Sequence, residues 1–313
     1  MLAIVCPGQG SQTPGFLAPW LELPSLAERL GELSRAAGVD LLAHGTTSDA
    51  DTIRDTAVAQ PLIVSASLLT LEAVLDGRPA TELVGVTAGH SVGELAAAVV
   101  AGVLDGPRAV TLVGARARAM ADAAARVPTG MSAVVGGDMS DVLAAIESAG
   151  AHPANVNGGG QVVAAGTLEA LASLADTPPA RARVIPLQVA GAFHTPFMEP
   201  ALEPFGAAAA ATDAAEPALP WLSDLDGRAM PADGRAALDR LVQQVVAPVR
   251  WDLVCEGLVE LGVTGLVELA PAGVLTGLAR RTLPGVETVA VKTPDDLLAA
   301  HDLITRHAHK EIA

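Results

Sequence analysis

The sequence predicts an α/β protein in which a smaller unit is inserted into a larger one. In the outer parts of the chain, short apolar runs alternate with segments of helical periodicity, and this alternation is typical of α/β folds with a mainly parallel sheet. In the middle, the expected order is strand, helix, strand, strand, helix, strand, which is the βαββαβ order of a ferredoxin-like unit. We therefore expect two domains.

The outer segments carry the expected elements of the large domain. Residues 83–88 and 265–269 are apolar, strand-like runs, whereas residues 64–75 and 110–126 show helical periodicity. Because strands and helices alternate, the strands are expected to run parallel to one another.

The middle of the chain supplies the six elements of the small domain. We expect them at residues 131–135, 139–148, 153–156, 161–165, 168–175 and 182–189. Turn-forming residues bound this series at 128–130 and 190–191. The prediction is a small domain at 128–191 and a discontinuous large domain formed by 1–127 and 192–313.

Composition excludes several classes of protein. The 313 residues are half hydrophobic, and 19 basic against 35 acidic residues leave a formal charge of -16, which disfavours binding to nucleic acid. Despite a mean hydropathy of +0.42, the apolar runs are short and broken, so we expect no membrane span. We see no signal peptide, and Cys6 and Cys255 form no disulfide framework. These features predict a cytoplasmic protein.

Residues 89–93 read G-H-S-V-G and fit the G-x-S-x-G pattern. An apolar strand precedes the motif and a helix-forming run follows it. A sharp turn between strand and helix exposes the serine oxygen, and the helix N-terminus favours developing negative charge. Ser91 is therefore the candidate nucleophile.

Residues 7–12 read P-G-Q-G-S-Q and follow the first apolar run. A dinucleotide-binding loop would need a third glycine where this chain has Thr13, so that interpretation fails. A tight turn beside the serine motif explains the pattern better. The backbone N–H groups of Gln9 and Val92 are then candidate donors to an oxyanion.

His194 is the candidate general base. It lies where the chain leaves the small domain, and pockets tend to form at domain junctions. A single histidine is more often structural, but a nucleophilic serine needs a base downstream. The rival His90 is the neighbour of Ser91 on the turn and is expected to point elsewhere.

Arg116 lies on an apolar stripe. Val113, Arg116, Ala117 and Met120 share one face of the expected helix, so the arginine should be buried and needs an anionic partner. A substrate carboxylate would serve, and so would an internal Asp or Glu. Spacing alone weights these two interpretations equally.

Together these motifs resemble the malonyl-CoA:acyl carrier protein transacylase family, which includes the acyltransferase domains of fatty-acid and polyketide synthases. The resemblance spans nearly the whole chain. The matching residues are 7–12, 60–61, 89–94, Arg116, 155–157, 191–196, Gln244, 248–251 and 271–278.

The resemblance implies a hydrolase-like large domain with a ferredoxin-like insert. It also implies that Ser91 forms a malonyl ester, that His194 transfers protons and that Arg116 pairs with the malonyl carboxylate. The backbone carbonyl of Gln244 would orient the histidine in place of a triad acid. Asn155 would bind substrate.

The implied reaction is ping-pong transfer from malonyl-CoA to the phosphopantetheine thiol of an acyl carrier protein, with no metal or redox cofactor. Val92 and Phe193 resemble the pattern of malonyl-selective members. The ring of Phe193 would crowd a 2-methyl group, although such size discrimination is modest.

Other functions remain open. A serine thioesterase shares the serine and histidine, a malonyltransferase subunit of a malonate decarboxylase shares the substrate, and a non-catalytic scaffold shares only the carrier protein. An acidic carrier would need a local basic patch, for which the candidates are Arg181, Arg183, Arg280 and Arg281. A monomer is the default expectation.

Overall fold

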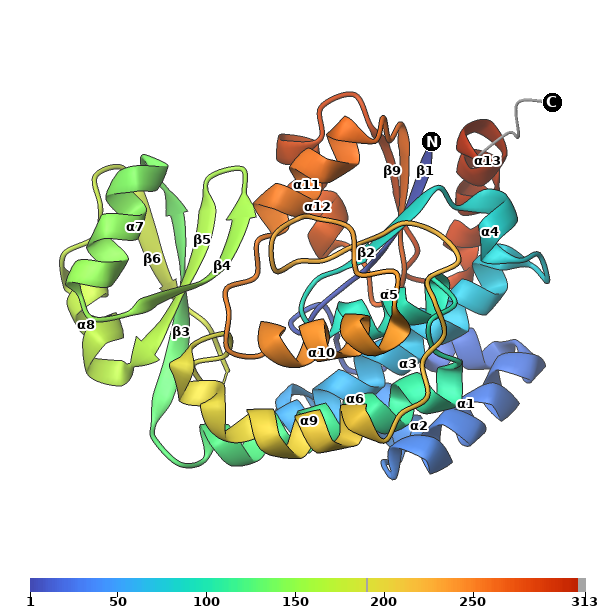
Figure 1. Ribbon diagram of the computed structural model, residues 1–313, viewed down its shortest axis with the longest axis horizontal. Helices are drawn as coiled ribbons and strands as arrows, with labels where there is room; N and C mark the ends of the chain where they lie inside the picture. Colours follow the sequence, from blue (N-terminus) through green and yellow to red (C-terminus); the bar gives the residue numbers. More distant parts are fainter. Residues whose placement is uncertain (190, 309–313) are drawn as a thin grey trace.

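The computed structural model describes residues 1–189 and 191–308. It is an α/β structure with two separate sheets (Figure 1). The strands are β1 (Leu2–Cys6), β2 (Val86–Gly89), β3 (Thr129–Gly136), β4 (His152–Gly158), β5 (Gln161–Thr167), β6 (Ala182–Pro186), β7 (Trp221–Leu222), β8 (Gly265–Glu268) and β9 (Glu287–Ala290).

The helices cover both sheets. They are α1 (Pro24–Ala37), α2 (Leu41–Thr46), α3 (Thr56–Leu75), α4 (Ala80–Leu83), α5 (Gly93–Val100), α6 (Gly106–Ala124), α7 (Met139–Ser148), α8 (Leu168–Asp176), α9 (Leu202–Ala210), α10 (Gly234–Gln244), α11 (Trp251–Glu260), α12 (Val274–Thr282) and α13 (Leu297–His307). Within the described residues there are also four short 3-10 helices: η1 (Ala18–Glu22), η2 (Thr52–Arg54), η3 (Pro196–Ala201) and η4 (Pro294–Asp296).

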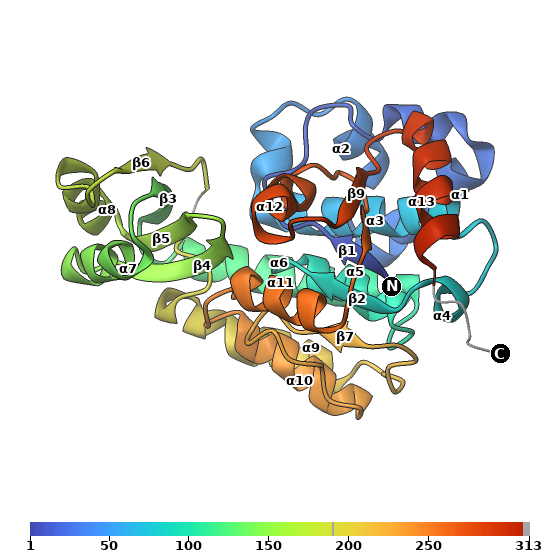
Figure 2. The same ribbon diagram turned by 90° about the horizontal axis from the view of Figure 1, so that it is seen from above.

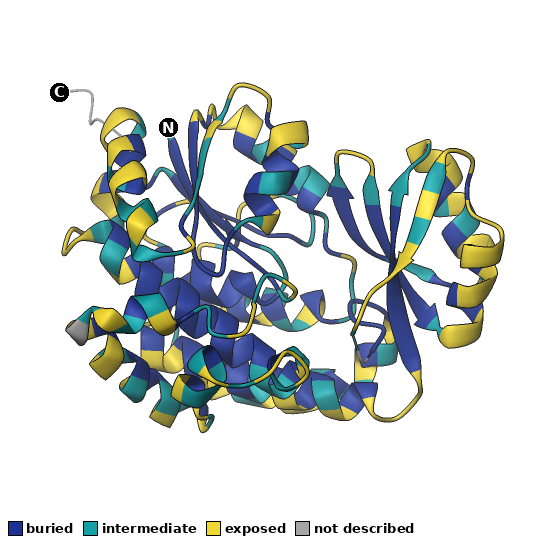
Figure 3. Ribbon diagram, turned by 180° about the vertical axis from the view of Figure 1, so that it is seen from behind, coloured by how far each residue is buried: buried dark blue, intermediate teal, exposed yellow. Residues whose placement is uncertain are grey.

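The larger sheet has five strands in the order β7-β2-β1-β8-β9, and every pair in it is parallel. Parallel sheets are normally covered on both faces. Along β1, Ile4 packs with the residues of α3, α5 and α6, whereas Val5 packs with those of α11 and α12. Figure 3 shows the strands and inner helices as buried and the outer helix faces as exposed.

The smaller sheet has four strands in the order β4-β5-β3-β6, and every pair in it is antiparallel. Its elements follow one another as β3, α7, β4, β5, α8 and β6, with α7 and α8 packed on one side (Figure 2). The last strand is shorter than the expected 182–189 and ends at Pro186.

The two sheets lie side by side, as Figures 1 and 2 show. A backbone bridge joins Asn155 of β4 to Val249, just before α11. The amide of Val249 donates to Ala154 at 2.9 Å, and the amide of Val156 donates to the carbonyl of Val249 at 2.8 Å. The segment before α11 therefore fixes the edge of the small sheet to the large unit.

Two further element boundaries differ from those expected. The helix expected at 64–75 begins at Thr56, because the Asp55 side chain caps it by accepting from the Ala57 amide at 2.8 Å. Pro61 therefore lies inside α3, although a proline usually marks a helix start. The strand expected at 83–88 is preceded by α4, which contains Leu83.

One apolar helix is longer and less interrupted than the short, broken runs that the sequence analysis described. Helix α3 has 20 residues and is apolar enough to cross a bilayer, but 78% of its most apolar window is buried inside the protein. Its surroundings make it a core helix of the large unit.

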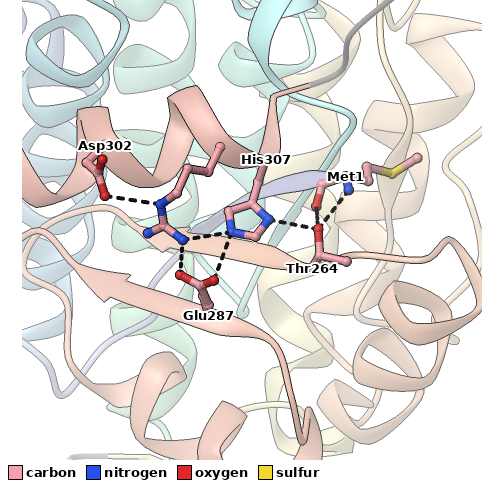
Figure 4. Close-up of polar contacts among 6 residues, drawn as sticks. Met1, Thr264, Glu287, Asp302 and His307 are labelled. Carbon is pink, nitrogen blue, oxygen red and sulfur yellow. Dashed lines mark hydrogen bonds and ion pairs between the residues drawn. The ribbon is translucent and has the colours of Figure 1, made fainter. Parts of the chain in front are cut away.

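A polar network joins the N-terminal strand to α13 (Figure 4). Thr264 contacts the Met1 amino group at 3.0 Å and His307 Nδ1 at 2.9 Å. His307 Nε2 lies 3.4 Å from Glu287, which also pairs with Arg306. The network fastens α13 across the edge of the parallel sheet.

Candidate active site

Ser91 lies on a tight turn between β2 and α5. Its φ angle is +53°, a conformation that is strained for a residue with a side chain and is common at functional turns. A Cβ at Gly93 would collide with the Cys6 carbonyl, and one at Gly89 would collide with the Gly93 backbone. Both glycines are therefore required for this turn to fit against β1.

The turn after β1 packs directly against the serine turn. A Cβ at Gly8 would lie 2.7 Å from the His90 carbonyl oxygen. Gln9 and Val92 both line the cavity in front of Ser91. Among the described residues, neither of their backbone N–H groups has an acceptor. Two amides beside the nucleophile can therefore donate to an oxyanion.

His194 lies next to Ser91. Its Nε2 is 2.7 Å from Ser91 Oγ, and its Nδ1 is 3.2 Å from the Gln244 carbonyl oxygen. Burial, assisted by Arg116, lowers the pKa of the His194 imidazole to about 3. The ring is therefore neutral at physiological pH and can accept a proton from Ser91.

Arg116 is buried at 3% exposure, on the same face of α6 as Val113, Ala117 and Met120. The predicted buried stripe is confirmed. The guanidinium donates to Gln60 Oε1 at 2.7 Å and to Ser91 Oγ at 3.3 Å. Burial lowers its pKa to about 10, so it remains a cation at neutral pH.

No carboxylate within the described residues forms an ion pair with Arg116. Glu94 and Asp224 lie close enough to influence its pKa but make no direct contact with it. Of the two interpretations that the spacing left open, the internal salt bridge therefore finds no support in the geometry. A buried cation 3.3 Å from the nucleophile is suited to an anionic substrate group.

The cavity in front of Ser91 has a volume of about 160 Å³ and lies between the two sheets. Asn155 and Phe193 line it, as do apolar side chains from the small sheet and from α12. His90 also reaches it, but its Nε2 contacts Asn157 at 3.0 Å, away from Ser91 Oγ. Of the predicted site residues, Ser91, His194, Gln9, Val92, Asn155 and Phe193 therefore line one cavity. Arg116 and Gln244 do not line it, but they contact Ser91 and His194.

Sequence reasoning missed Asp224 as a neighbour of the serine, and it quoted Gln60 and Glu94 only as parts of matching motifs. Gln60 is a buried polar residue in the apolar helix α3, and this contrast could have identified it. Asp224 follows β7, and its Oδ2 accepts from the Ser91 amide at 2.5 Å. No local pattern connects it with a serine 133 positions away.

The turn, the histidine and the buried arginine form a candidate site for serine acyl transfer, and the sequence comparison agrees with that class. Residues 3–294 match the family model described as "Acyl transferase domain", so the chain belongs to this family. Among curated proteins it is 51% identical to the malonyl CoA-acyl carrier protein transacylase of Mycobacterium tuberculosis, covering 95% of this chain and 98% of the relative. It therefore belongs to the malonyl-CoA:acyl carrier protein transacylase family.

Other relatives agree. The protein of the same name from Escherichia coli K12 is 34% identical, covering 96% of this chain and 99% of the relative. The crystal structure of MCAT from Mycobacterium tuberculosis has a TM-score of 0.90 at 51% identity, covering 96% and 99% of the two chains. A malonyl-transacylase in complex with a type II polyketide synthase acyl carrier protein has a TM-score of 0.90 at 30% identity, with the same coverage.

Proposed function

We propose that this chain transfers the malonyl group of malonyl-CoA to the phosphopantetheine thiol of an acyl carrier protein through a malonyl ester on Ser91. The names of its relatives supply the substrate and the acceptor. The observation that carries the proposal is the buried Arg116 cation, which lies 3.3 Å from Ser91 Oγ and has only neutral hydrogen-bond partners among the described residues. A thioester with a terminal carboxylate would supply the directly bonded anionic partner that Arg116 lacks.

In the first half-reaction, Ser91 Oγ attacks the thioester carbonyl while His194 Nε2 takes the hydroxyl proton. The Gln9 and Val92 amides stabilise the oxyanion. When the tetrahedral intermediate collapses, the C–S bond breaks and His194 gives its proton to the coenzyme A thiol. In the second half, the carrier thiol loses its proton to His194 and attacks the ester, and Ser91 recovers the proton.

The proposal requires one tautomer of His194. Nε2 must be free to accept, so Nδ1 carries the hydrogen and donates to the Gln244 carbonyl 3.2 Å away. The Gln244 side-chain amide, 3.1 Å from Nδ1 and 3.5 Å from Asp224 Oδ2, then donates to Asp224. Gln244 is thus the orienting residue, and no carboxylate contacts the imidazole among the described residues.

Substrate selection is proposed to depend on residues at the junction of the two units. Phe193, buried at 6% exposure, lines the cavity beside His194 and would crowd a substituent at C2 of the malonyl group. Asn155 faces the same cavity from β4 and offers an amide to the substrate.

The domain assignment is part of this proposal. A hydrolase-like domain would comprise 1–127 and 192–313, and its support is the parallel order β7-β2-β1-β8-β9 with a serine turn after β2. A ferredoxin-like domain would comprise 128–191, and its support is the antiparallel order β4-β5-β3-β6. A cytoplasmic monomer remains the proposed state.

Carrier docking is proposed at the mouth of the cavity. Leu187 and Val274 line the cavity and are 37% and 46% exposed, which makes an apolar rim. The four candidate arginines, Arg181, Arg183, Arg280 and Arg281, are all exposed. Lys292 is a further candidate, because its ammonium lies over Gly273, next to Val274.

A labelling experiment tests the proposed function. The protein is incubated with radiolabelled malonyl-CoA, isolated, and then mixed with phosphopantetheinylated carrier protein. We expect label on the wild type that moves to the carrier, and none on Ser91→Ala. Three results would contradict the proposal. Label released only to water would favour a thioesterase, and the absence of label on the wild type would favour a non-catalytic scaffold. Transfer only to the carrier protein of a malonate decarboxylase would favour the malonyltransferase subunit of that enzyme.

A further inference from the structure

Two buried carboxyl groups lie beneath the nucleophile and have no role in the mechanism above. Glu94 is in the first turn of α5 and is 1% exposed, and Asp224 follows β7 and is fully buried. The Asp224 amide donates to Glu94 Oε1 at 3.0 Å. Asp224 Oδ2 accepts from the Ser91 amide at 2.5 Å and from Gln244 Nε2 at 3.5 Å.

The remaining oxygen of each carboxyl group lacks a partner. Within the described residues, Glu94 Oε2 and Asp224 Oδ1 are buried and make no hydrogen bond. Neither carboxylate forms an ion pair within the same residues. Two neighbouring anions in a dry site repel each other, and each loses its hydration. A proton between the two partnerless oxygens would remove the repulsion and leave one buried charge in place of two.

We propose that Glu94 and Asp224 share one proton, so that the pair carries a single negative charge and acts as a positioning element for Ser91. Glu94 Oε2–H would donate to Asp224 Oδ1, and Asp224 Oδ2 would remain an anionic acceptor for the Ser91 amide. The two residues are in direct contact, since the Asp224 amide donates to Glu94 Oε1. Burial raises the pKa of both groups, that of Asp224 to about 7 and that of Glu94 well above its usual range.

This arrangement explains how a strained serine is held. Ser91 keeps a φ of +53°, and such a conformation persists only when its surroundings determine it. Asp224 Oδ2 accepts from the Ser91 amide. Gln244 extends the network, because its Nε2 donates to Asp224, its Oε1 accepts from Arg116, and its backbone carbonyl accepts from His194 Nδ1. One buried acceptor therefore contacts the nucleophile directly and reaches the base and the cation through Gln244.

The net charge of the Glu94–Asp224 pair should also affect how well Arg116 binds a substrate carboxylate. The cations facing it are Arg116 of α6 and Arg240 of α10, and Arg240 is already paired with Asp226. His194, reached through Gln244, is neutral. A single negative charge balances Arg116 before a substrate enters, whereas a second charge would compete with a substrate carboxylate for Arg116. Loss of the shared proton at alkaline pH should therefore weaken acylation of Ser91.

The shared proton can be observed directly. Protein labelled with ¹³C at the Asp and Glu carboxyl carbons is titrated by NMR. At about pH 7.5 exposed carboxyls are ionised, and we expect one signal to keep the chemical shift of a protonated carboxyl. Glu94→Gln and Asp224→Asn should each remove it, because a carboxamide N–H takes the place of the proton.

The matched control is Glu268→Gln, which should leave that signal in place. Glu268 is equally buried but accepts three backbone amides, from Gly273, Leu275 and Thr276, at 2.8–2.9 Å. A wild-type spectrum without a protonated carboxyl signal, or a signal lost only in Glu268→Gln, would overturn the proposal.

Kinetics test the positioning role, which rests on the proposed function. The rate of Ser91 malonylation is measured between about pH 6 and pH 9.5. The wild-type rate should fall about tenfold per pH unit above the pKa of the shared proton, and Glu94→Gln should lose this fall. Asp224→Ala should be about tenfold to a hundredfold slower than wild type at neutral pH, because the Ser91 amide loses its acceptor.

The outcomes are separable. If the malonylation rate falls equally at alkaline pH in wild type and Glu94→Gln, the proposed effect of the pair's charge is contradicted. If the malonylation rate of folded Asp224→Ala equals that of wild type, the proposed positioning of Ser91 by Asp224 is contradicted. A wild-type protein that is never malonylated would contradict the proposed function instead, while the NMR experiment would still decide whether the proton is shared.

Discussion

The cavity around Ser91 has two walls of different chemistry. On the large-unit side, His194, Arg116 and Gln244 are buried, Ser91 is partly buried, and hydrogen bonds join them. On the small-unit side, Met131 and Val163 supply apolar surface from β3 and β5, and Leu187 extends it from the segment after β6. The polar wall fixes the positions of the reacting atoms, and the apolar wall determines the shape of the space for the acyl group.

The difference teaches where each kind of substitution should act. A hydrogen-bonded, buried wall cannot adjust when one member is removed, so its loss appears in the chemical step. An apolar wall can be reshaped, so changes there should alter which acyl group fits. Charged side chains at the mouth of the cavity belong to neither wall, so substituting them should affect only the association with the carrier protein.

The largest effect is expected on the polar wall. His194→Ala should slow acylation of Ser91 by about a hundredfold to ten-thousandfold, the usual cost of losing a positioned base. Rapid quenching followed by intact-protein mass spectrometry measures the rate. His90→Ala is the matched control and should cost less than about tenfold, because His90 contacts Asn157 rather than Ser91. Near-normal acylation of His194→Ala would remove this residue from the mechanism.

A smaller effect is expected where the two walls meet. Phe193→Ser removes the ring that lines the cavity beside His194, so the ratio of kcat/KM for methylmalonyl-CoA to that for malonyl-CoA should rise about tenfold. A thermal melt checks that the variant is folded. If the ratio stays the same in a folded variant, selectivity resides in other residues.

The smallest effect is expected at the mouth. Lys292→Glu should raise the KM for the acidic carrier about twofold to fivefold at saturating malonyl-CoA, the range of an exposed charge contact. Arg78→Glu is the control, since it makes the same charge change at an exposed site that does not line the cavity. Equal responses of the two variants would show a general charge effect and would contradict local docking at Lys292.

The polar wall also shows what a sequence can predict. Periodicity along α6 was enough to predict that Arg116 is buried, and the G-x-S-x-G pattern was enough to predict that Ser91 lies on a turn. Both signals are local in the sequence. The α/β class followed from the alternation of apolar runs. Strand and helix ends were less certain, since the cap at Asp55 that starts α3 competes with the breaking effect of Pro61.

Partners across the fold could not be predicted in this way. Asp224 contacts Ser91 only because β7 pairs with β2, and nothing near Asp224 in the sequence indicates that pairing. Whether Arg116 has a carboxylate partner likewise depends on distances between helices. A helical stripe predicts burial, but it does not determine what the buried group contacts.

The most direct test of the account is to compare two substrates on Arg116→Ala. If Arg116 binds the malonyl carboxylate, kcat/KM for malonyl-CoA should fall about thirtyfold to a few thousandfold. Acetyl-CoA has no carboxylate, so its transfer should fall little or rise. Arg116→Lys should recover malonyl transfer only in part, because an ammonium lacks the planar fork of a guanidinium.

The same variants are examined by thermal melting. The account predicts a selective loss of malonyl transfer in a protein that remains folded. Parallel losses for both substrates, accompanied by a lower Tm, would instead show that Arg116 stabilises the structure and would contradict its assignment to the substrate carboxylate.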